Sequence, residues 1–195
     1  ADKSAAEYKD PRAIAKGCNF GCFYGLFPKG LQRTLKFKAG LDTSLAECEK
    51  IIANLKAGYP QLSLWQDVVK RQAKVRRYSE TWLGRRRYLP GIVSDDWGKK
   101  SFAERCAMNT PIQGTAADIL KMAMARLVVE LPEYPWIVPV LTVHDSLVFY
   151  VAEEKVQEAG VLIKGLMERQ PFPEFDVPLV AEVATGTNYG ELDEW

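Results

Sequence analysis

The stretch WIVPVLTVHDSLVFYV, residues 136–151, decides the fold class. Two runs rich in apolar and β-branched residues, 136–143 and 147–151, flank His144-Asp145, which predicts a buried antiparallel hairpin with a tight turn. Around it, hydrophobic spacing and turn residues predict helices at 10–24, 42–57, 62–77, 99–108, 113–131 and 153–169, a short hairpin at 80–89 and a strand at 178–184. Helices fill the first half and antiparallel strands with covering helices fill the second. The predicted class is therefore α+β.

Asp145 is the first candidate functional residue. A carboxylate held between two rigid strands is well placed to ligate a metal ion. Asp is also a common turn residue, so the pattern alone leaves a structural and a metal-binding interpretation open.

A second candidate is a stripe of four residues on the first predicted helix: Arg12, Lys16, Phe20 and Tyr24. Four-residue spacing places successive members on one slowly drifting face, roughly 6 Å apart along the helix axis. Two cations followed by two aromatic rings match a ligand with a polyanionic tail and a flat ring, such as a nucleoside triphosphate. The alternative is an amphipathic helix whose aromatic residues face the core.

The third candidate is Arg105, Asn109 and Gln113, again four residues apart, with Pro111 interrupting the helix before Gln113. All three side chains can donate hydrogen bonds. The DNA minor groove presents an acceptor on every base in nearly the same place, so donors there can test pair geometry without reading sequence. The alternative is a set of polar capping and surface residues.

Composition adds weaker constraints. The chain has 195 residues, 47% hydrophobic and 26% charged, which is ordinary for a folded soluble protein, and its net charge is only +1. Residues 67–105 carry eleven Lys/Arg against five acids, a net +6, and residues 146–195 carry three against ten, a net −7. The basic segment could follow a phosphate backbone, but a charge run is more often just a solvated face, so this asymmetry is weak evidence. No apolar run approaches the ~20 residues of a membrane span.

The four cysteines, Cys18, Cys22, Cys48 and Cys106, are interpreted as reduced packing residues. A metal pair at Cys18 and Cys22 is the alternative, but no second Cys/His pair completes it.

Taken together, the motifs resemble DNA polymerase family A, the DNA polymerase I-like enzymes. RAIAKGCNFGCFYG (12–25) resembles motif B, the nucleotide-binding O helix, and VHD (143–145) resembles motif C. ETWLGRRRYLP (80–90) and ERCAMNTPIQGTAAD (104–118) resemble two further family segments, and residues 183–189 stand in place of the C-terminal strand. The motifs occur in the family's order along nearly the whole chain.

The resemblance implies roles for the first stripe. Arg12 and Lys16 would grip the triphosphate, and Lys16 is also a candidate general acid for the pyrophosphate leaving group. Phe20 would stack on the incoming base and sugar, and Phe rather than Tyr there implies discrimination against dideoxynucleotides. Tyr24 and Gly25 would border the templating base.

The other motifs imply contacts with DNA and metal. Arg105, Asn109 and Gln113 would sense the minor groove of the primer–template end. Arg86 is placed among the DNA-binding residues, and His144 near the primer terminus. Asp145 would ligate Mg²⁺.

Two departures from the family pattern matter. Ser146 replaces the usual Glu of motif C, which resembles the His-Asp-Ser of phage-type single-subunit RNA polymerases and makes them the enzyme alternative. Phe20-Gly21 and residues 113–118 favour DNA. Motif A, which supplies the second metal-ligating Asp, should precede Arg12 and is not found among the eleven residues there.

Two-metal phosphoryl transfer needs carboxylates from both sides of the ion pair, so one Asp is not enough. We therefore expect a polymerase fragment or one subunit of a split enzyme, inactive alone, whose partner brings motif A and the thumb. An accessory nucleic-acid-binding module is the non-enzyme alternative.

The expected architecture is an incomplete right hand: a helical fingers subdomain at 1–98, followed by the C-terminal part of an antiparallel-sheet palm at 99–195. The expected partners are primer–template DNA and dNTPs, with no membrane. We expect a cytoplasmic location in a bacterial or phage-infected cell, with an organellar origin as the alternative.

Overall fold

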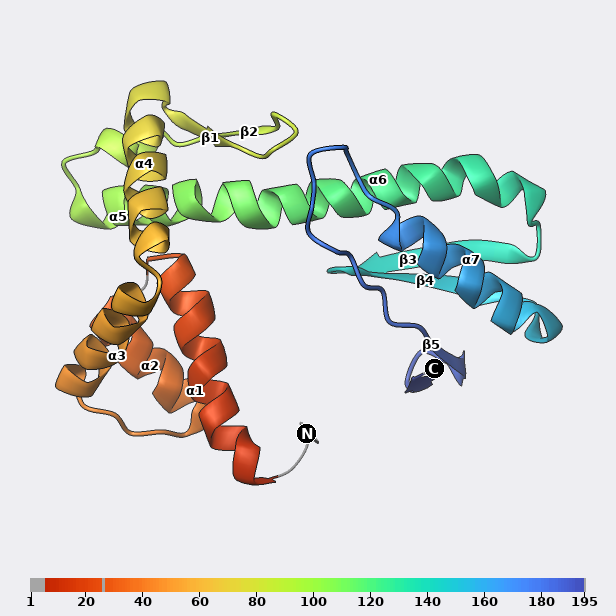
Figure 1. The fold of residues 1–195 in the computed structure, drawn as a ribbon, viewed down its shortest axis with the longest axis horizontal. Helices are drawn as coiled ribbons and strands as arrows, with labels where there is room; N and C mark the ends of the chain where they lie inside the picture. The colour runs from red at the N-terminus through yellow and green to blue at the C-terminus, as the bar shows by residue number, and fades with distance from the viewer. Residues whose placement is uncertain (1–5, 26, 195) are drawn as a thin grey trace. The chain divides into compact units, whose positions relative to one another are not determined.

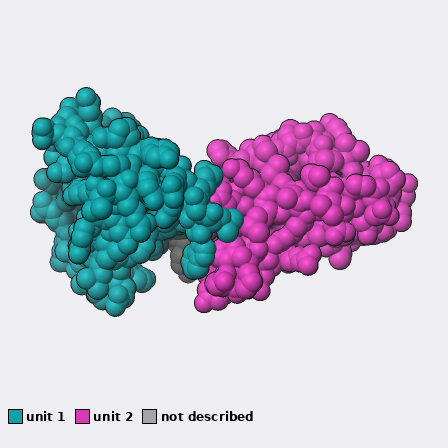
Figure 2. Space-filling view, turned by 90° about the horizontal axis from the view of Figure 1, so that it is seen from above, with its two compact units in different colours: residues 1–114 teal, residues 115–195 magenta. Residues whose placement is uncertain are grey.

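The computed structural model describes residues 6–25 and 27–194, whose helices and strands are traced in Figure 1. The chain divides into two compact units, residues 1–114 and 115–195, coloured teal and magenta in Figure 2. Helices combine with three antiparallel strand pairs in the described residues, which confirms the α+β class. The break between units follows Gly114, whereas the predicted boundary between fingers and palm is at 98/99. The fingers and palm assignment itself stays a prediction.

Unit 1 opens with three helices, α1 (Ala6–Phe23), α2 (Pro28–Ala39) and α3 (Leu45–Gly58). Their shared core consists of Cys18, Cys22, Leu31, Leu35, Cys48 and Ile52. All four cysteines of the chain are free and buried, in agreement with the packing interpretation. Burial raises the pKa of the Cys18 and Cys22 thiols, which keeps both uncharged.

Two predictions about the first helices were wrong. α1 begins at Ala6 rather than near Asp10, so Pro11 lies inside the helix and not at its first position. α2 was missed because its sequence is largely polar and only Leu31 and Leu35 anchor it in the core.

The start of α3 was predicted at 42–43 but lies two residues later. Ser44 is its N-cap, because Ser44 and Glu47 form a reciprocal capping box. The Ser44 hydroxyl accepts from the Glu47 amide at 3.2 Å, and the Glu47 carboxylate accepts from the Ser44 amide at 2.7 Å. The bond from the Ser44 amide, and a second from the Ser44 hydroxyl at 2.8 Å, lower the pKa of the Glu47 carboxyl.

The rest of unit 1 is built on α4 (Pro60–Arg76) and α5 (Trp97–Asn109). Between them lie the hairpin strands β1 (Tyr78–Glu80) and β2 (Arg86–Tyr88), paired from Tyr78↔Tyr88 to Glu80↔Arg86, and the short helix η1 (Pro90–Val93). Their core consists of Val69, Ala73, Leu89, Ile92, Ala103, Cys106, Ala107 and Met108, with Trp65 against it. The two helices and the hairpin were predicted within a few residues.

The helical path then changes at η2 (Thr110–Gly114), one turn of π-helix. A regular α-helix would pair the Ala107 carbonyl with the amide of residue 111, but Pro111 has no N–H. The buried hydroxyl of Ser79 donates to that carbonyl instead, at 2.8 Å. The predicted interruption at Pro111 is therefore confirmed, and its cost is offset by a side chain of the β1–β2 hairpin.

Unit 2 contains α6 (Thr115–Glu130), the hairpin β3 (Ile137–Val143) and β4 (Ser146–Val151), and α7 (Val156–Glu168), with short helices η3 (Leu131–Glu133) and η4 (Glu153–Lys155) at the connections. The hairpin register ends at Val143↔Ser146, so its loop is His144-Asp145, as predicted. The predicted burial of the hairpin was wrong, because β3 is exposed from Val138 to Thr142 in this structure. Arg126 of α6 joins the end of α7 by donating to the carbonyls of Arg169 at 2.7 Å and Gln170 at 2.8 Å.

The strand predicted at 178–184 was wrong. Residues 177–183 contain no strand, because the Ala181 amide donates to the Glu168 carboxylate at 2.8 Å rather than to a neighbouring strand. The final strands are β5 (Ala184–Asn188) and β6 (Glu191–Glu194), paired antiparallel. Within the described part of the chain, no helix has the length and apolar character to cross a membrane.

Candidate functional site

Helix α1 has one face in the core and one face in solvent. Cys18 and Cys22 are buried at 5% and 6% exposure, while Arg12 and Lys16 are exposed. The structure therefore places the two predicted phosphate-gripping cations one turn apart on the free side of this helix. The side chain of Phe20 lies outside the described residues.

The C-terminal end of α1 is fixed by groups from two other helices. Gln66 of α4 is 7% exposed, and its Nε2 donates to the carbonyls of Cys22 at 2.7 Å and Phe23 at 2.9 Å. These carbonyls belong to the last helical turn, where intrahelical donors run out. Gly25 follows in the left-handed region with φ 73°, and a Cβ there would lie 2.6 Å from Met108 Cε of α5. The half-buried Tyr24 is thus held between two anchored positions.

The three predicted minor-groove residues follow one another along α5 and η2. Arg105 is half-buried, and its Nη1 donates to the Ser101 hydroxyl at 2.7 Å. Asn109 is half-buried at the last position of α5, and Gln113 is exposed within the π turn. All three belong to unit 1, together with the α1 residues.

Beside them lies a pocket of about 250 Å³, lined by Arg85, Arg86, Arg87, Asn109, Thr110 and Gly114. Arg85 Nη2 donates to the Gly114 carbonyl at 3.0 Å. Arg86 lies over the Tyr78 ring, 4.6 Å from its centroid, with its Nε 3.6 Å from the Glu80 carboxylate. Three arginines line this pocket, and arginine suits a phosphate, which accepts paired N–H donors. Arg86 thus lines this pocket together with Arg85 and Arg87, and its contact with DNA stays a prediction.

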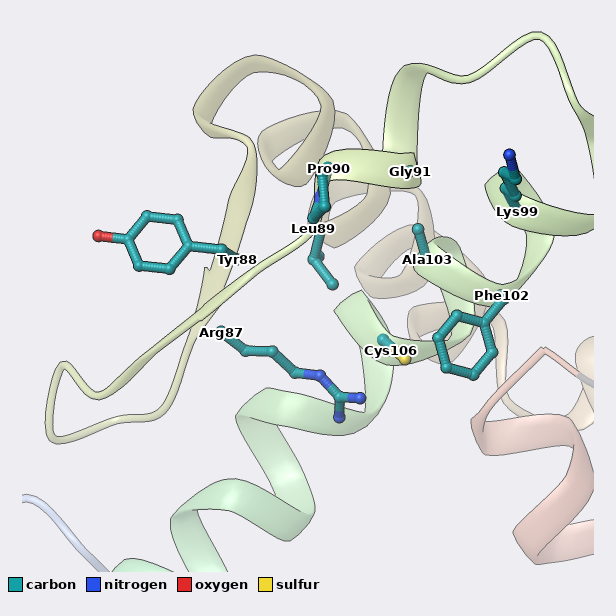
Figure 3. A pocket seen from close by; sticks show the side chains of 9 residues that line it. All are labelled: Arg87, Tyr88, Leu89, Pro90, Gly91, Lys99, Phe102, Ala103 and Cys106. Carbon is teal, nitrogen blue, oxygen red and sulfur yellow. The ribbon is translucent and has the colours of Figure 1, made fainter.

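A second pocket, of about 310 Å³, lies between β2, η1 and α5 (Figure 3). Its walls are mainly apolar, with Leu89 facing Ala103, Phe102 and Cys106. In Figure 3 the Arg87 side chain extends from β2 toward α5, and the Tyr88 ring points away from the pocket. Arg87 borders both pockets.

The motif C residues lie in unit 2, on the turn of the β3–β4 hairpin. His144 and Asp145 are exposed, and His144 has φ 54°, in the left-handed region that non-glycine residues rarely adopt. The Ser146 hydroxyl donates to the Val143 carbonyl at 2.8 Å across the turn. A strained two-residue turn between paired strands restricts the backbone from which the Asp145 side chain extends.

The described residues do not form a metal site by themselves. Across residues 6–25 and 27–194, no group of three or more His, Cys, Asp or Glu side chains is placed to hold a metal ion. Mg²⁺ requires near-octahedral oxygen coordination and is usually bound through one or two carboxylates plus water and phosphate. The metal-ligand role of Asp145 therefore stays a prediction.

Sequence reasoning missed the residues that hold the site in place. Gln66 and Arg85 carry no motif-level chemistry of their own, yet each bonds a backbone carbonyl beside a predicted contact residue. The role of Ser79, in contrast, is partly indicated by the sequence. Pro111 inside a helical pattern leaves the carbonyl four residues earlier without a donor, which calls for a hydroxyl or amide from elsewhere.

Comparison with known proteins defines the class. Residues 3–191 match the model of DNA polymerase family A, and the chain belongs to this family. It is 37% identical over 188 residues to the thermostable DNA polymerase I of Thermus filiformis, covering 94% of this chain and 21% of that protein. It is 39% identical over 159 residues to DNA polymerase I of Geobacillus stearothermophilus, covering 81% of this chain and 18% of that protein.

A phage protein is also among the relatives. The DNA polymerase of Bacillus phage SP01 is 35% identical over 193 residues, covering 95% of this chain and 21% of that protein. Among solved structures, the POL domain of Pol1 from M. smegmatis, in complex with DNA primer-template and dNTP, superposes with a TM-score of 0.77 at 34% identity, covering 91% of this chain and 30% of that one. The chain therefore spans about a fifth of the length of these curated relatives.

Proposed function

We propose that this chain is the nucleotide- and DNA-contacting part of a DNA-directed DNA polymerase that adds dNTPs to a primer 3′-OH. The observation that carries the proposal is the helix α1, which buries its cysteine face and leaves Arg12 and Lys16 in solvent. Membership of DNA polymerase family A supports it. So does the solved relative, which was determined with primer-template DNA and dNTP.

On the nucleotide side, Arg12 and Lys16 bind the triphosphate of the incoming dNTP. Arg offers paired donors to phosphate oxygens and Lys a compact charge, which also makes Lys16 the candidate proton donor to pyrophosphate. Phe20 stacks on the base and sugar. Tyr24 and Gly25 border the templating base, at the end of α1 whose carbonyls Gln66 bonds.

On the DNA side, Arg105, Asn109 and Gln113 donate to minor-groove acceptors near the primer end, and the Arg85–Arg87 pocket takes a backbone phosphate. Arg86, already predicted from the sequence to bind DNA, is one of the three arginines that line this pocket. The predicted pattern is general rather than sequence-specific, because these acceptors are shared by all bases.

The catalytic metal site is completed by another part of the polymerase. Divalent ions there would activate the primer hydroxyl and stabilise charge on the transferred phosphate. Asp145 supplies one carboxylate and His144 lies near the primer terminus. The second carboxylate comes from a polymerase portion that carries motif A and the thumb.

Binding measurements test the nucleotide side. A fluorescent dNTP is titrated into the 195-residue chain, and the Arg12→Ala and Lys16→Ala variants are compared with Lys50→Ala, an exposed lysine on α3. Each of the first two should weaken binding about 10- to 100-fold, the range of a lost charge-assisted hydrogen bond. Lys50→Ala should bind like wild type. Equal losses in all three variants would contradict a specific triphosphate site.

Primer extension tests the enzyme assignment. The chain with Mg²⁺ and four dNTPs should not extend a primer alone, and should do so when a family A portion carrying motif A is added in trans. Asp145→Ala should abolish that extension. Extension by the chain alone that is lost in Asp145→Ala would show that a second carboxylate is present here, and the divided-site proposal would be wrong.

A further inference from the structure

The π turn η2 sets the relation between Asn109 and Gln113. In a regular helix, residues four apart share a face, whereas a π turn advances by about one more residue per turn and alters that relation. Asn109 ends α5 immediately before the turn, and Gln113 lies inside it. The direction in which the two amide side chains leave the backbone therefore depends on how this turn is held.

The β1–β2 hairpin bonds the backbone on both sides of the turn. Ser79 Oγ donates to the Ala107 carbonyl at 2.8 Å, before Asn109. Arg85 Nη2 donates to the Gly114 carbonyl at 3.0 Å, after Gln113. Single π turns are uncommon and concentrate at functional sites, so a turn bonded at both ends by one hairpin is a specific arrangement.

The β1–β2 hairpin also packs tightly against the π turn. Thr81 is 3% exposed, and a Cβ added at Gly114 would lie 2.6 Å from its Cγ2. Thr81 cannot easily move away, because its amide donates to the Arg85 carbonyl at 3.0 Å and its hydroxyl accepts from the Arg85 amide at 3.1 Å. The absence of a side chain at residue 114 is thus what allows the hairpin and the turn to meet.

We infer that Ser79, Thr81 and Arg85 are positioning residues that hold Asn109 and Gln113 in the geometry needed to bond purine N3 and pyrimidine O2 at a correctly paired primer end. This inference rests on the proposed function. It assigns the hairpin the task of making minor-groove recognition stringent, and Arg85 serves this task through its bond to the Gly114 carbonyl as well as lining the phosphate pocket.

The experiment perturbs the contact and then relieves it. Gly114→Ala introduces the methyl group that meets Thr81, Thr81→Ser deletes the opposing methyl while keeping the hydroxyl that accepts from Arg85, and the double variant combines both. Each chain is titrated by fluorescence anisotropy with a primer–template duplex whose last two primer bases are guanine or 3-deazaguanine, which lacks the N3 acceptor. Circular dichroism checks that each variant is folded.

Wild type and Thr81→Ser should bind the guanine duplex more tightly than the 3-deaza duplex, by a factor on the order of 5. Gly114→Ala should reduce that ratio to about 1 while still binding DNA, and the double variant should restore it. A general loss of folding would weaken both duplexes alike and leave the ratio unchanged.

Retention of the ratio in Gly114→Ala, or failure of Thr81→Ser to restore it, would overturn the positioning role. A wild-type chain that binds both duplexes equally would refute minor-groove recognition, and the inference would fall with it. A wild-type chain that binds neither duplex would instead contradict the proposed function.

Discussion

Replacing Gln66 with alanine should loosen the end of the helix that carries the candidate nucleotide site. Its Nε2 donates two hydrogen bonds, of 2.7 Å to the Cys22 carbonyl and 2.9 Å to the Phe23 carbonyl, from a side chain only 7% exposed. At 0.5–1.5 kcal/mol for each bond, their loss destabilises this region by about 1–3 kcal/mol. The Cys22 carbonyl would still accept a hydrogen bond from the Gly25 amide at 3.1 Å and would not be left without a donor. We therefore expect a destabilisation in the middle of this range, about 2 kcal/mol.

Hydrogen exchange is the appropriate assay, because a protein with two compact units need not unfold in a single transition. Amides in the last two turns of α1 should exchange about 30-fold faster in Gln66→Ala, the factor that corresponds to about 2 kcal/mol. Gln66→Leu fills the space but donates nothing, and should behave like the alanine variant. Gln72→Ala, on an exposed position of the same helix, is the matched control and should change little.

The reasoning would be refuted in two ways. If Gln66→Leu exchanges like wild type, packing rather than hydrogen bonding holds the end of α1. If Gln66→Ala exchanges like Gln72→Ala, the two carbonyls are satisfied without this side chain.

Further predictions concern backbone conformation and acid stability. Gly25→Ala should lower the melting temperature more than Gly40→Ala. Both glycines are left-handed, with φ of 73° and 68°, but only at residue 25 would the new methyl group meet another side chain, Met108, at 2.6 Å. Equal shifts in melting temperature would show that Met108 moves aside without cost. The depressed pKa of Glu47 stabilises the fold above the carboxyl's ordinary pKa, and this contribution is lost as the pH falls through the lowered value. Glu47→Gln should therefore make unfolding below about pH 4 less steep in an acid titration followed by circular dichroism, and an unchanged slope would contradict the capping-box assignment.

Local signals in the sequence were enough for much of the fold. The β3–β4 hairpin was predicted with its turn at His144-Asp145, because two apolar runs left only one place for the loop. The break at Pro111 was predicted because a missing amide is a property of the residue itself. By contrast, α2 depends on two core leucines within a polar sequence, and the connector before β5 depends on Glu168 accepting from a residue thirteen positions later. Such tertiary contacts leave no periodic pattern to detect.

The candidate site likewise contains some features that the sequence predicts and others that it does not. Arg12 and Lys16 were predicted to share one face of this helix, and both are exposed, while Cys18 and Cys22 lie on a different, buried face. The groups that hold the site, Gln66 and Arg85, act through backbone carbonyls far away in the chain. Every residue has a backbone carbonyl, so the sequence does not show which carbonyl a given side chain will bond.

The bond from Ser79 to the Ala107 carbonyl also has a consequence for the order of folding. Because Pro111 cannot complete the last turn of α5, that turn lacks one of its own hydrogen bonds until a hydroxyl from 28 residues earlier arrives. During synthesis the hairpin emerges before α5 does, so the donor is already present when its acceptor is made. A nascent chain can therefore close this junction as it appears, whereas an isolated peptide spanning α5 and η2 should fray at its proline.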